Sequence, residues 1–455
     1  MLPETSLRSD VLPRLGMPRL RSLSARLWRG DRPLFALFQS LGAQVFITVI
    51  NVATGVITAR LLGPEGRGIY AAVTLWPPLL ASLATAGLGT AVVFRMRQSG
   101  SNAGAIASTG LLLALIQSSI AAGIGVFLLP HFLSQYPPAV VFIAQLCLVS
   151  VLVNGAQTLM KQAFAGAGQF RWYNLTHLSP QLFYLLTLLA IIPFVPLTAN
   201  GAILALLGSG AIATLAVIPA FKKRVQPRVQ DARAEVSPLL SYSARAALTD
   251  VVQALAANAD RLVLIPLLPV GELGLYAVAF SFSRVIQLVQ PAIMSVVLSQ
   301  MSRATPADSQ RLHDMASRFL IAALLCSCAV LWVIGGWLLV FTYGSEFGAI
   351  STPFRVLIAE ASFGVLSQVT MQLFLSRNRP GVVSAIQGAA LCASIASLLI
   401  LVPRFGTTGA ALGLLLAGVF RWVLLLLAMK VVLGLPLPRL YLNRADWRYL
   451  KNRLR

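Results

Sequence analysis

Charged side chains stand inside long apolar stretches of this sequence, where a membrane would surround them. Two are arginines, Arg245 and Arg284, and three are acids, Asp250, Asp260 and Glu360. An ionised side chain near the centre of a membrane helix costs about 2.5–3.5 kcal/mol, so each needs a partner or water. Arginine presents planar, multidentate donors to anionic groups. We therefore predict that Arg284 and Arg245 bind an anionic part of a substrate.

The three acids admit two interpretations. A carboxyl group in a low-dielectric cavity favours its uncharged form, so Asp250, Asp260 and Glu360 are predicted to carry a coupling proton or ion. The alternative is an internal salt bridge, for example between Arg284 and either Asp250 or Asp260.

Uncharged polar residues recur at helical spacing along several of the same stretches. Gln44 and Asn51 lie on one face of the first stretch, and Gln287 lies near Arg284 in a later one. We predict that Gln44, Asn51 and Gln287 also contact the substrate. Helix–helix packing is the alternative, because small and polar residues also hold membrane helices together.

No residue pattern predicts a metal site or a catalytic centre. The four cysteines lie in apolar stretches, and the three histidines lie in or near loops without ligand spacing. Packing is the better interpretation for the cysteines. We expect no catalytic residue, no metal and no cofactor.

The elements that hold these residues are predicted to be membrane-spanning helices. The chain has 455 residues, of which 57% are hydrophobic and 11% charged, whereas soluble domains carry roughly 25% charged residues. Apolar runs of about 18 to 28 residues recur, the length that crosses ~30 Å of hydrocarbon. We therefore predict an all-α polytopic membrane protein with about twelve transmembrane helices, the second kinked at Pro77 and Pro78. The predicted spans are 34–59, 69–94, 104–129, 138–165, 173–195, 199–220, 238–267, 273–300, 315–342, 350–375, 381–402 and 408–433.

The formal net charge is +22, and its distribution predicts an orientation. Basic residues concentrate in the tails, 1–33 and 434–455, and in the middle loop, 221–237, as the positive-inside rule requires of cytoplasmic segments. Nucleic-acid binding would need these charges interleaved with aromatics on one folded surface, so we expect no nucleic-acid partner. We expect a multi-pass protein of the bacterial inner membrane with both termini in the cytoplasm.

The second half of the sequence repeats features of the first. The segment 61–71, LLGPEGRGIYA, aligns with 267–277, LLPVGELGLYA, at an offset of 206 residues. Each half holds about six spans, an even number, so the halves share one orientation and are related by an axis along the membrane normal. We therefore predict two parallel six-helix bundles, 34–220 and 238–433, with the substrate site between them.

Two segments carry a resemblance to a known family. The stretch 57–73, ITARLLGPEGRGIYAAV, and the stretch 258–280, NADRLVLIPLLPVGELGLYAVAF, closely resemble the polysaccharide-export flippases. These are the Wzx-type members of the multidrug/oligosaccharidyl-lipid/polysaccharide (MOP) superfamily, and the resemblance covers roughly 34 to 433. It implies a V-shaped bundle that works by alternating access.

The resemblance also implies a cargo. Oligosaccharide units linked to undecaprenyl pyrophosphate, the precursors of O-antigen, capsule or exopolysaccharide, would move from the cytoplasmic to the periplasmic leaflet. Arg284 and Arg245 would then contact the pyrophosphate. Membrane lipids and other polysaccharide-assembly proteins are the expected partners.

Two other functions remain as alternatives. A drug or cation antiporter of the same superfamily should carry acids in its first bundle, but the interiors of the first six predicted spans contain no Asp or Glu. A membrane-embedded polysaccharide polymerase should carry a long external loop, and no loop here is long enough to fold as a catalytic domain. We therefore predict a transporter rather than an enzyme.

Overall fold

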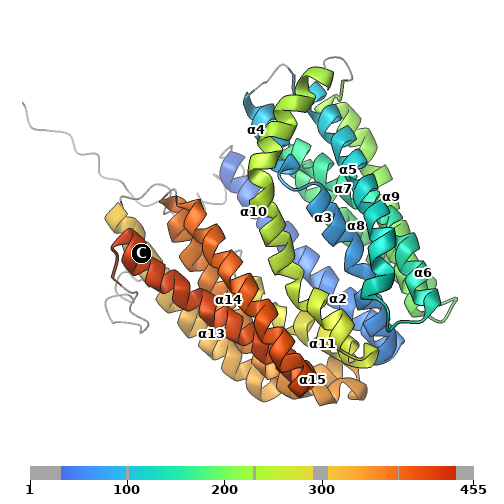
Figure 1. Ribbon diagram of the computed structural model, residues 1–455, viewed down its shortest axis with the longest axis vertical. Coiled ribbons are helices and arrows are strands. Elements are labelled where there is room, and N and C mark those ends of the chain that lie inside the picture. The colour runs from blue at the N-terminus through green and yellow to red at the C-terminus, as the bar shows by residue number, and fades with distance from the viewer. Residues whose placement is uncertain (1–31, 99–101, 229–231, 290–305, 378, 437–455) are drawn as a thin grey trace, which may run out of the picture.

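The computed structural model describes residues 32–98, 102–228, 232–289, 306–377 and 379–436. Within these ranges the chain forms helices and no strand, so the prediction of an all-α fold is confirmed (Figure 1). Nearly all of both predicted basic tails lies outside the described residues, as does the end of the span predicted at 273–300.

Two sets of helices follow one another along the chain. The first set is α2 (Arg32–Thr74), α3 (Trp76–Ala84), α4 (Leu88–Gln98), α5 (Ala103–Phe132), α6 (Pro138–Cys147), α7 (Val149–Gly166), α8 (Phe170–Ile191) and α9 (Ala199–Val225). The second is α10 (Ala232–Leu267), α11 (Val270–Ser283), the 3-10 helix η1 (Arg284–Val289), α13 (Pro306–Tyr343), the 3-10 helix η2 (Ser345–Ile350), α14 (Ser351–Ser376) and α15 (Pro380–Leu433). Seven segments of the described residues are long and apolar enough to cross a membrane.

Two of these helices are each long enough for two spans. Helix α2 has 43 residues and α15 has 54, or about 65 Å and 80 Å at 1.5 Å per residue. Each is bent at a glycine with a left-handed backbone, Gly63 at φ 63° and Gly406 at φ 55°. These elbows replace the short loops predicted at 60–68 and 403–407, because a single glycine is enough to turn the chain.

The second predicted span is broken twice. Helix α2 ends at Thr74, and α3 begins with Pro77 and Pro78 in its first turn, so the predicted kink is confirmed. A second break follows between α3 and α4, where Gly87 has φ 74°. A broken membrane helix leaves backbone groups that a neighbour must satisfy. Here Asp250 accepts the Gly87 N–H at 2.8 Å, and Ser243 donates to the carbonyl of Ala86 at 3.0 Å.

The helices form two lobes. We call α2–α9 the first lobe and α11–α15 the second. In Figure 1 the first lobe is blue to green on the right, and α13, α14 and α15 of the second lobe are orange to red on the left. The yellow helix α11 meets α2 where the lobes converge. This arrangement is the predicted V-shaped bundle.

The lobes meet through the two copies of the repeated motif. A Cβ added to Gly68 would collide with the carbonyl of Val270, and one added to Gly274 would collide with the carbonyl of Pro64. At the offset of 206 residues Gly68 is equivalent to Gly274 and Pro64 to Val270. The contact is therefore reciprocal, as a pseudo-two-fold axis between the halves requires. We call these four residues the elbow contact.

Helix α10 packs on both lobes, against α3, α4 and α5 of the first and α15 of the second. Its N-terminal part is attached to α4 by an ion pair between Glu235 and Arg95 at 2.7 Å. The rings of Tyr242 and Phe94 stack next to it, with centroids 4.6 Å apart. On the sequence alone, residues 238–267 were predicted to belong to the second bundle. In the structure the N-terminal part of α10, as far as Asp250, contacts the first lobe.

Candidate functional site

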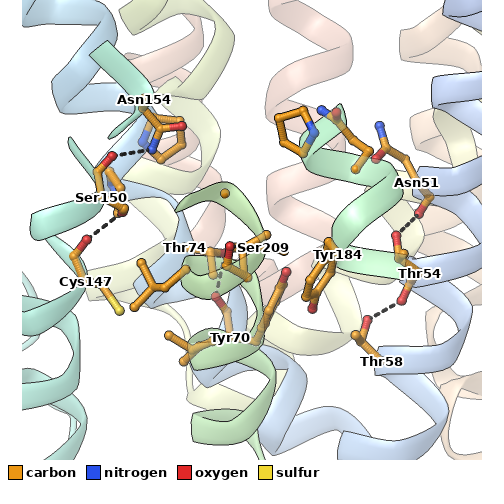
Figure 2. Close-up of a pocket in the computed structure, with 18 of the residues that line it drawn as sticks. Asn51, Thr54, Thr58, Tyr70, Thr74, Cys147, Ser150, Asn154, Tyr184 and Ser209 are labelled. Carbon is orange, nitrogen blue, oxygen red and sulfur yellow. Dashed lines mark hydrogen bonds between the residues drawn. The ribbon is translucent and has the colours of Figure 1, made fainter. Parts of the chain in front are cut away.

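A pocket lined by both polar and apolar side chains lies inside the first lobe, with a volume of about 390 Å³. This size falls within the range of small-molecule sites. Its walls come from α2, α3, α6, α7, α8 and α9, and Ser281 of α11 is its one contribution from the second lobe. Figure 2 shows Asn154, Ser150 and Cys147 on one side and Asn51, Thr54 and Thr58 on the other.

The α2 wall presents hydroxyl and amide groups one turn apart. The hydroxyl of Thr54 donates to the carbonyl of Ile50 at 3.0 Å, and that of Thr58 donates to the carbonyl of Thr54 at 2.7 Å. Their oxygens can still accept a hydrogen bond from a ligand. Asn51, one of the predicted substrate contacts, lines the pocket and is exposed.

Arg67 supplies the charge of the pocket. Its Nη1 donates to the hydroxyl of Thr58 at 2.9 Å, and its guanidinium lies over the ring of Tyr70 at 5.0 Å. Its Nε is buried without a hydrogen-bond partner among the described residues. The Tyr70 ring stacks in turn on Tyr184, with centroids 6.5 Å apart and planes 15° apart.

The opposite wall is uncharged and polar. Asn154 donates to the carbonyl of Ser150 at 2.8 Å, and Gln157 donates to the carbonyl of Gly210 at 3.2 Å. Oε1 of Gln181 is buried and accepts no hydrogen bond within the described part of the chain. The lining residues that the structure describes include no Asp, Glu, Lys or His, so Arg67 is their one full charge.

A second group of polar residues lies in the second lobe. Arg284 forms an ion pair with Glu360 of α14 at 2.9 Å, and its guanidinium lies over the ring of Phe280 at 4.1 Å. Arg261 lies over the same ring at 5.6 Å. The partner of Arg284 is thus neither of the two acids that the sequence suggested as examples.

Those two acids bind other groups. Asp260 is buried and accepts a hydrogen bond from the hydroxyl of Tyr276 at 2.9 Å, which joins α10 to α11. Asp250 holds the break at Gly87. Both positions have a structural role, and neither carboxylate lines the first-lobe pocket.

The other predicted contacts are dispersed. Arg245 is exposed on α10, and its Nη2 lies 3.3 Å from the hydroxyl of Ser241. Gln44 lies on α2 and is absent from the lining of the pocket. Gln287 belongs to η1, and its side chain lies outside what the structure describes. The structure therefore brings only Asn51 of the predicted substrate contacts into the pocket.

Sequence reasoning missed Arg67, because it assigned residues 60–68 to a loop, where a charge is unremarkable. Helix α2 instead continues past Gly63, and Arg67 reaches Thr58 nine positions earlier. The Gly63-Pro64 pair could have indicated this position, because glycine can end one helix and proline can begin the next directly after it.

The sequence matches one family along most of its length. Residues 57–352 match the family described as polysaccharide biosynthesis protein. The chain belongs to this family. The match begins in α2 and ends in α14, so it includes the elbow contact and all of the first-lobe pocket except the lining residues before position 57.

Solved structures with the same fold are transporters and flippases. An inward-facing multidrug resistance MATE family transporter of the MOP superfamily is 15% identical, with a TM-score of 0.67 over 85% of this chain and 96% of that one. The lipid II flippase MurJ, in an inward closed conformation, is 13% identical, with a TM-score of 0.69 over 87% and 88%. An outward-facing MATE transporter is 17% identical, with a TM-score of 0.63 over 90% and 97%. No curated protein sequence matches the chain.

This protein is therefore a multi-pass membrane member of a polysaccharide biosynthesis family with the MOP transporter fold. The predicted fold is confirmed. At such low identity the solved structures establish the fold alone.

Proposed function

We propose that this polysaccharide biosynthesis protein flips oligosaccharide units linked to undecaprenyl pyrophosphate across the bacterial inner membrane. The observation that carries the proposal is the first-lobe pocket. Its walls combine hydroxyl, amide and tyrosine side chains, which suit the many hydroxyls and the apolar ring faces of a sugar. Apolar lining residues such as Ile203 and Leu207 lie between these polar groups, and a cargo with both hydroxyls and apolar faces suits such mixed walls.

The charge of the pocket argues against the alternative function, a drug or cation antiporter. A cation antiporter needs a carboxylate or an aromatic cage to stabilise its cargo. Here the residues that the structure describes around the pocket include Arg67 and no acid. A cationic drug would meet a positive charge, whereas an anionic or neutral saccharide would not be repelled.

The two lobes supply a transport cycle. In the present conformation the elbow contact closes one end, and a cycle would open that end and close the other. The saccharide and pyrophosphate would travel between the lobes while the lipid tail remains in the bilayer. We propose that the basic loop 221–237 and both termini lie on the cytoplasmic side of the membrane, because cytoplasmic segments are enriched in Lys and Arg.

The pyrophosphate would be held between the lobes by the predicted residues. We propose that the substrate is contacted by Arg284, Arg245, Gln44 and Gln287. Asn51 is a further proposed contact, and it also lines the first-lobe pocket. Glu360 pairs with Arg284 at 2.9 Å, and a phosphate oxygen would compete for the same guanidinium.

Accumulation of lipid-linked oligosaccharide in a deletion strain tests the proposal. The wild type should clear the accumulated units, and Gln181→Leu, which removes the unpaired acceptor of the pocket, should clear them about tenfold more slowly. Gln98→Leu is the matched control, because Gln98 is exposed at the end of α4. An unchanged lipid pool together with altered drug tolerance would instead favour the antiporter.

A further inference from the structure

We propose that the first-lobe pocket selects an acidic sugar, whose carboxylate binds Arg67. This inference rests on the proposed function and names the class of saccharide carried. It predicts that the exported polymer contains a sugar with a carboxylate, such as a uronic acid.

The first step is the charge of the pocket. Arg67 takes part in no ion pair within the described chain, and no acid is found among the described lining residues. Nε of Arg67 is buried, and a charge taken out of water is costly unless water or a counter-charge reaches it. Arg95 and Arg284, by contrast, each have a carboxylate, at 2.7 Å and 2.9 Å. Arg67 therefore lacks the anion that a ligand would supply.

The second step is the geometry of the guanidinium. The hydroxyl of Thr58 engages Nη1 at 2.9 Å and the Tyr70 ring lies beneath at 5.0 Å, so the side chain is held in place. The buried Nε keeps its proton without an acceptor. A carboxylate can accept from Nε and from one Nη in the bidentate arrangement that arginine favours.

The third step is the surroundings of Arg67. Tyr70 and Tyr184 both line the pocket beside Arg67, and aromatic side chains can pack on the apolar face of a sugar ring. Oε1 of Gln181 is a buried acceptor without a donor, which a sugar hydroxyl would satisfy. The pocket thus offers an anion contact, a ring face and a hydroxyl acceptor together.

Charge number favours a carboxylate over the phosphates of the lipid carrier. A carboxylate carries a single negative charge, which one arginine balances, whereas a pyrophosphate carries more and would need further cations. The described lining contains no second cation. The walls also come almost entirely from one lobe, whereas the carrier phosphates must stay close to a lipid tail in the bilayer.

Binding of small probes to the purified full-length protein in lipid nanodiscs tests the inference. The probes are methyl glucuronide, methyl glucoside and inorganic pyrophosphate, and ligand-observed NMR with competition gives their relative affinities. We expect at least a tenfold preference for the glucuronide over the glucoside. Arg67→Gln should abolish this preference, whereas Arg97→Gln, which removes an exposed charge at the end of α4, should keep it.

Thermal unfolding of each variant separates loss of binding from loss of folding. If Arg67→Gln does not fold, Arg67→Lys keeps the charge without the planar fork, and it should reduce the preference at least threefold. Equal affinity for both glycosides would overturn the acidic-sugar inference and leave the flippase proposal standing. Arg67-dependent binding of pyrophosphate but not of glucuronide would overturn it too, and would assign Arg67 to the carrier. Binding of none of the three probes would overturn the inference, and the accumulation assay would still decide the function.

Discussion

At the scale of single residues, the charges of this membrane protein are divided between structural and unpaired roles. The carboxylate of Asp250 satisfies a broken helix, that of Asp260 joins two helices, and Glu360 neutralises Arg284. Arg67 alone among the charges discussed here faces a pocket without an acid. The acids that hold the fold therefore lie apart from Arg67, which lines the pocket.

The ion pair between Arg284 and Glu360 should behave as a buried pair. The exposed fractions of the two side chains are 26% and 10%. Breaking such a pair by removing one partner costs up to about 3–5 kcal/mol, because a charge is left uncompensated. Arg284→Gln should therefore lower the unfolding temperature more than the double variant Arg284→Gln/Glu360→Gln does. Thermal unfolding in detergent measures both, and a loss in the double variant equal to the sum of the losses in Arg284→Gln and Glu360→Gln would mean that the pair does not interact.

Variants of Asp250 can distinguish a structural role of its carboxylate from a role in ion coupling. In Asp250→Asn the amide oxygen can still accept the Gly87 N–H, so we expect normal folding and normal transport. Asp250→Leu leaves that N–H unsatisfied, which should cost about 1–3 kcal/mol. Thermal unfolding and the accumulation assay are the measurements. Loss of transport with retained stability in Asp250→Asn would show that the negative charge itself is required.

The sequence predicted the polar positions better than their partners. It identified Asn51, Asp250, Asp260, Arg284 and Glu360 as residues that a lipid environment would not leave exposed. It did not predict which acid meets Arg284, because the partner lies on α14, and the rotation of that helix against α11 depends on tertiary packing. Arg67 was missed because a charge beside a turn carries no signal until the turn is known to be helical on both sides.

At the scale of helices, glycines determine where the chain bends and where it approaches another helix. Gly63 and Gly406 bend helices that are each long enough for two spans, and Gly87 lies at the second break of the second span. Gly68 and Gly274 allow the backbones of α2 and α11 to touch. Long apolar spans could be predicted from hydrophobic length, and seven segments of the described residues are long and apolar enough to cross a membrane. The elbows could not be predicted, because left-handed glycines do not interrupt an apolar run.

Enlarging Gly68 should open the elbow contact. A valine there would collide with the carbonyl of Val270, so Gly68→Val should shift the lobes toward a conformation open at that end. A cysteine pair at Glu65 and Gly271 reports closure, because Cγ of Glu65 lies 3.8 Å from the Cβ position of Gly271. In a background without native cysteines, Gly68→Val should reduce disulfide yield at least fivefold.

Gly208→Val is the matched control for that experiment. Gly208 is exposed on α9, and nothing lies within 4 Å of its Cβ position. Its valine variant should cross-link as the parent does. Unchanged cross-linking in Gly68→Val would mean that the two backbones can separate slightly without opening the lobes.

At the scale of the whole molecule, α10 connects the two lobes. Its N-terminal part is attached to the first lobe through Glu235 and Arg95, and its hydroxyl at Ser243 binds the broken second span. The same helix also packs on α15. A movement of the lobes must therefore bend α10 or detach one of its halves.

Charge reversal tests the attachment of α10. Glu235→Arg places two cations together, so the helix end should leave α4, and Arg95→Glu in the same chain should restore the pair. Spin labels at Ala244 of α10 and Arg97 of α4, both exposed, report the distance. We expect a broadened, longer distribution in the single variant and a distribution close to the parent in the double variant. A single variant with the parent distribution would show that the remaining contacts suffice.

The reciprocal elbow contact has a consequence for how this molecule arose. Two separate copies of one half could have met through the same surface as a homodimer, each glycine against the partner's carbonyl. In such a dimer every charge would occur twice, on both sides of the axis. In the fused chain the position equivalent to Arg67 is Leu273, which is buried against the core, and the position equivalent to Arg284 is Pro78. When both halves belong to one chain, the side chains on the two sides of the axis can differ, while the elbow contact between the halves stays the same.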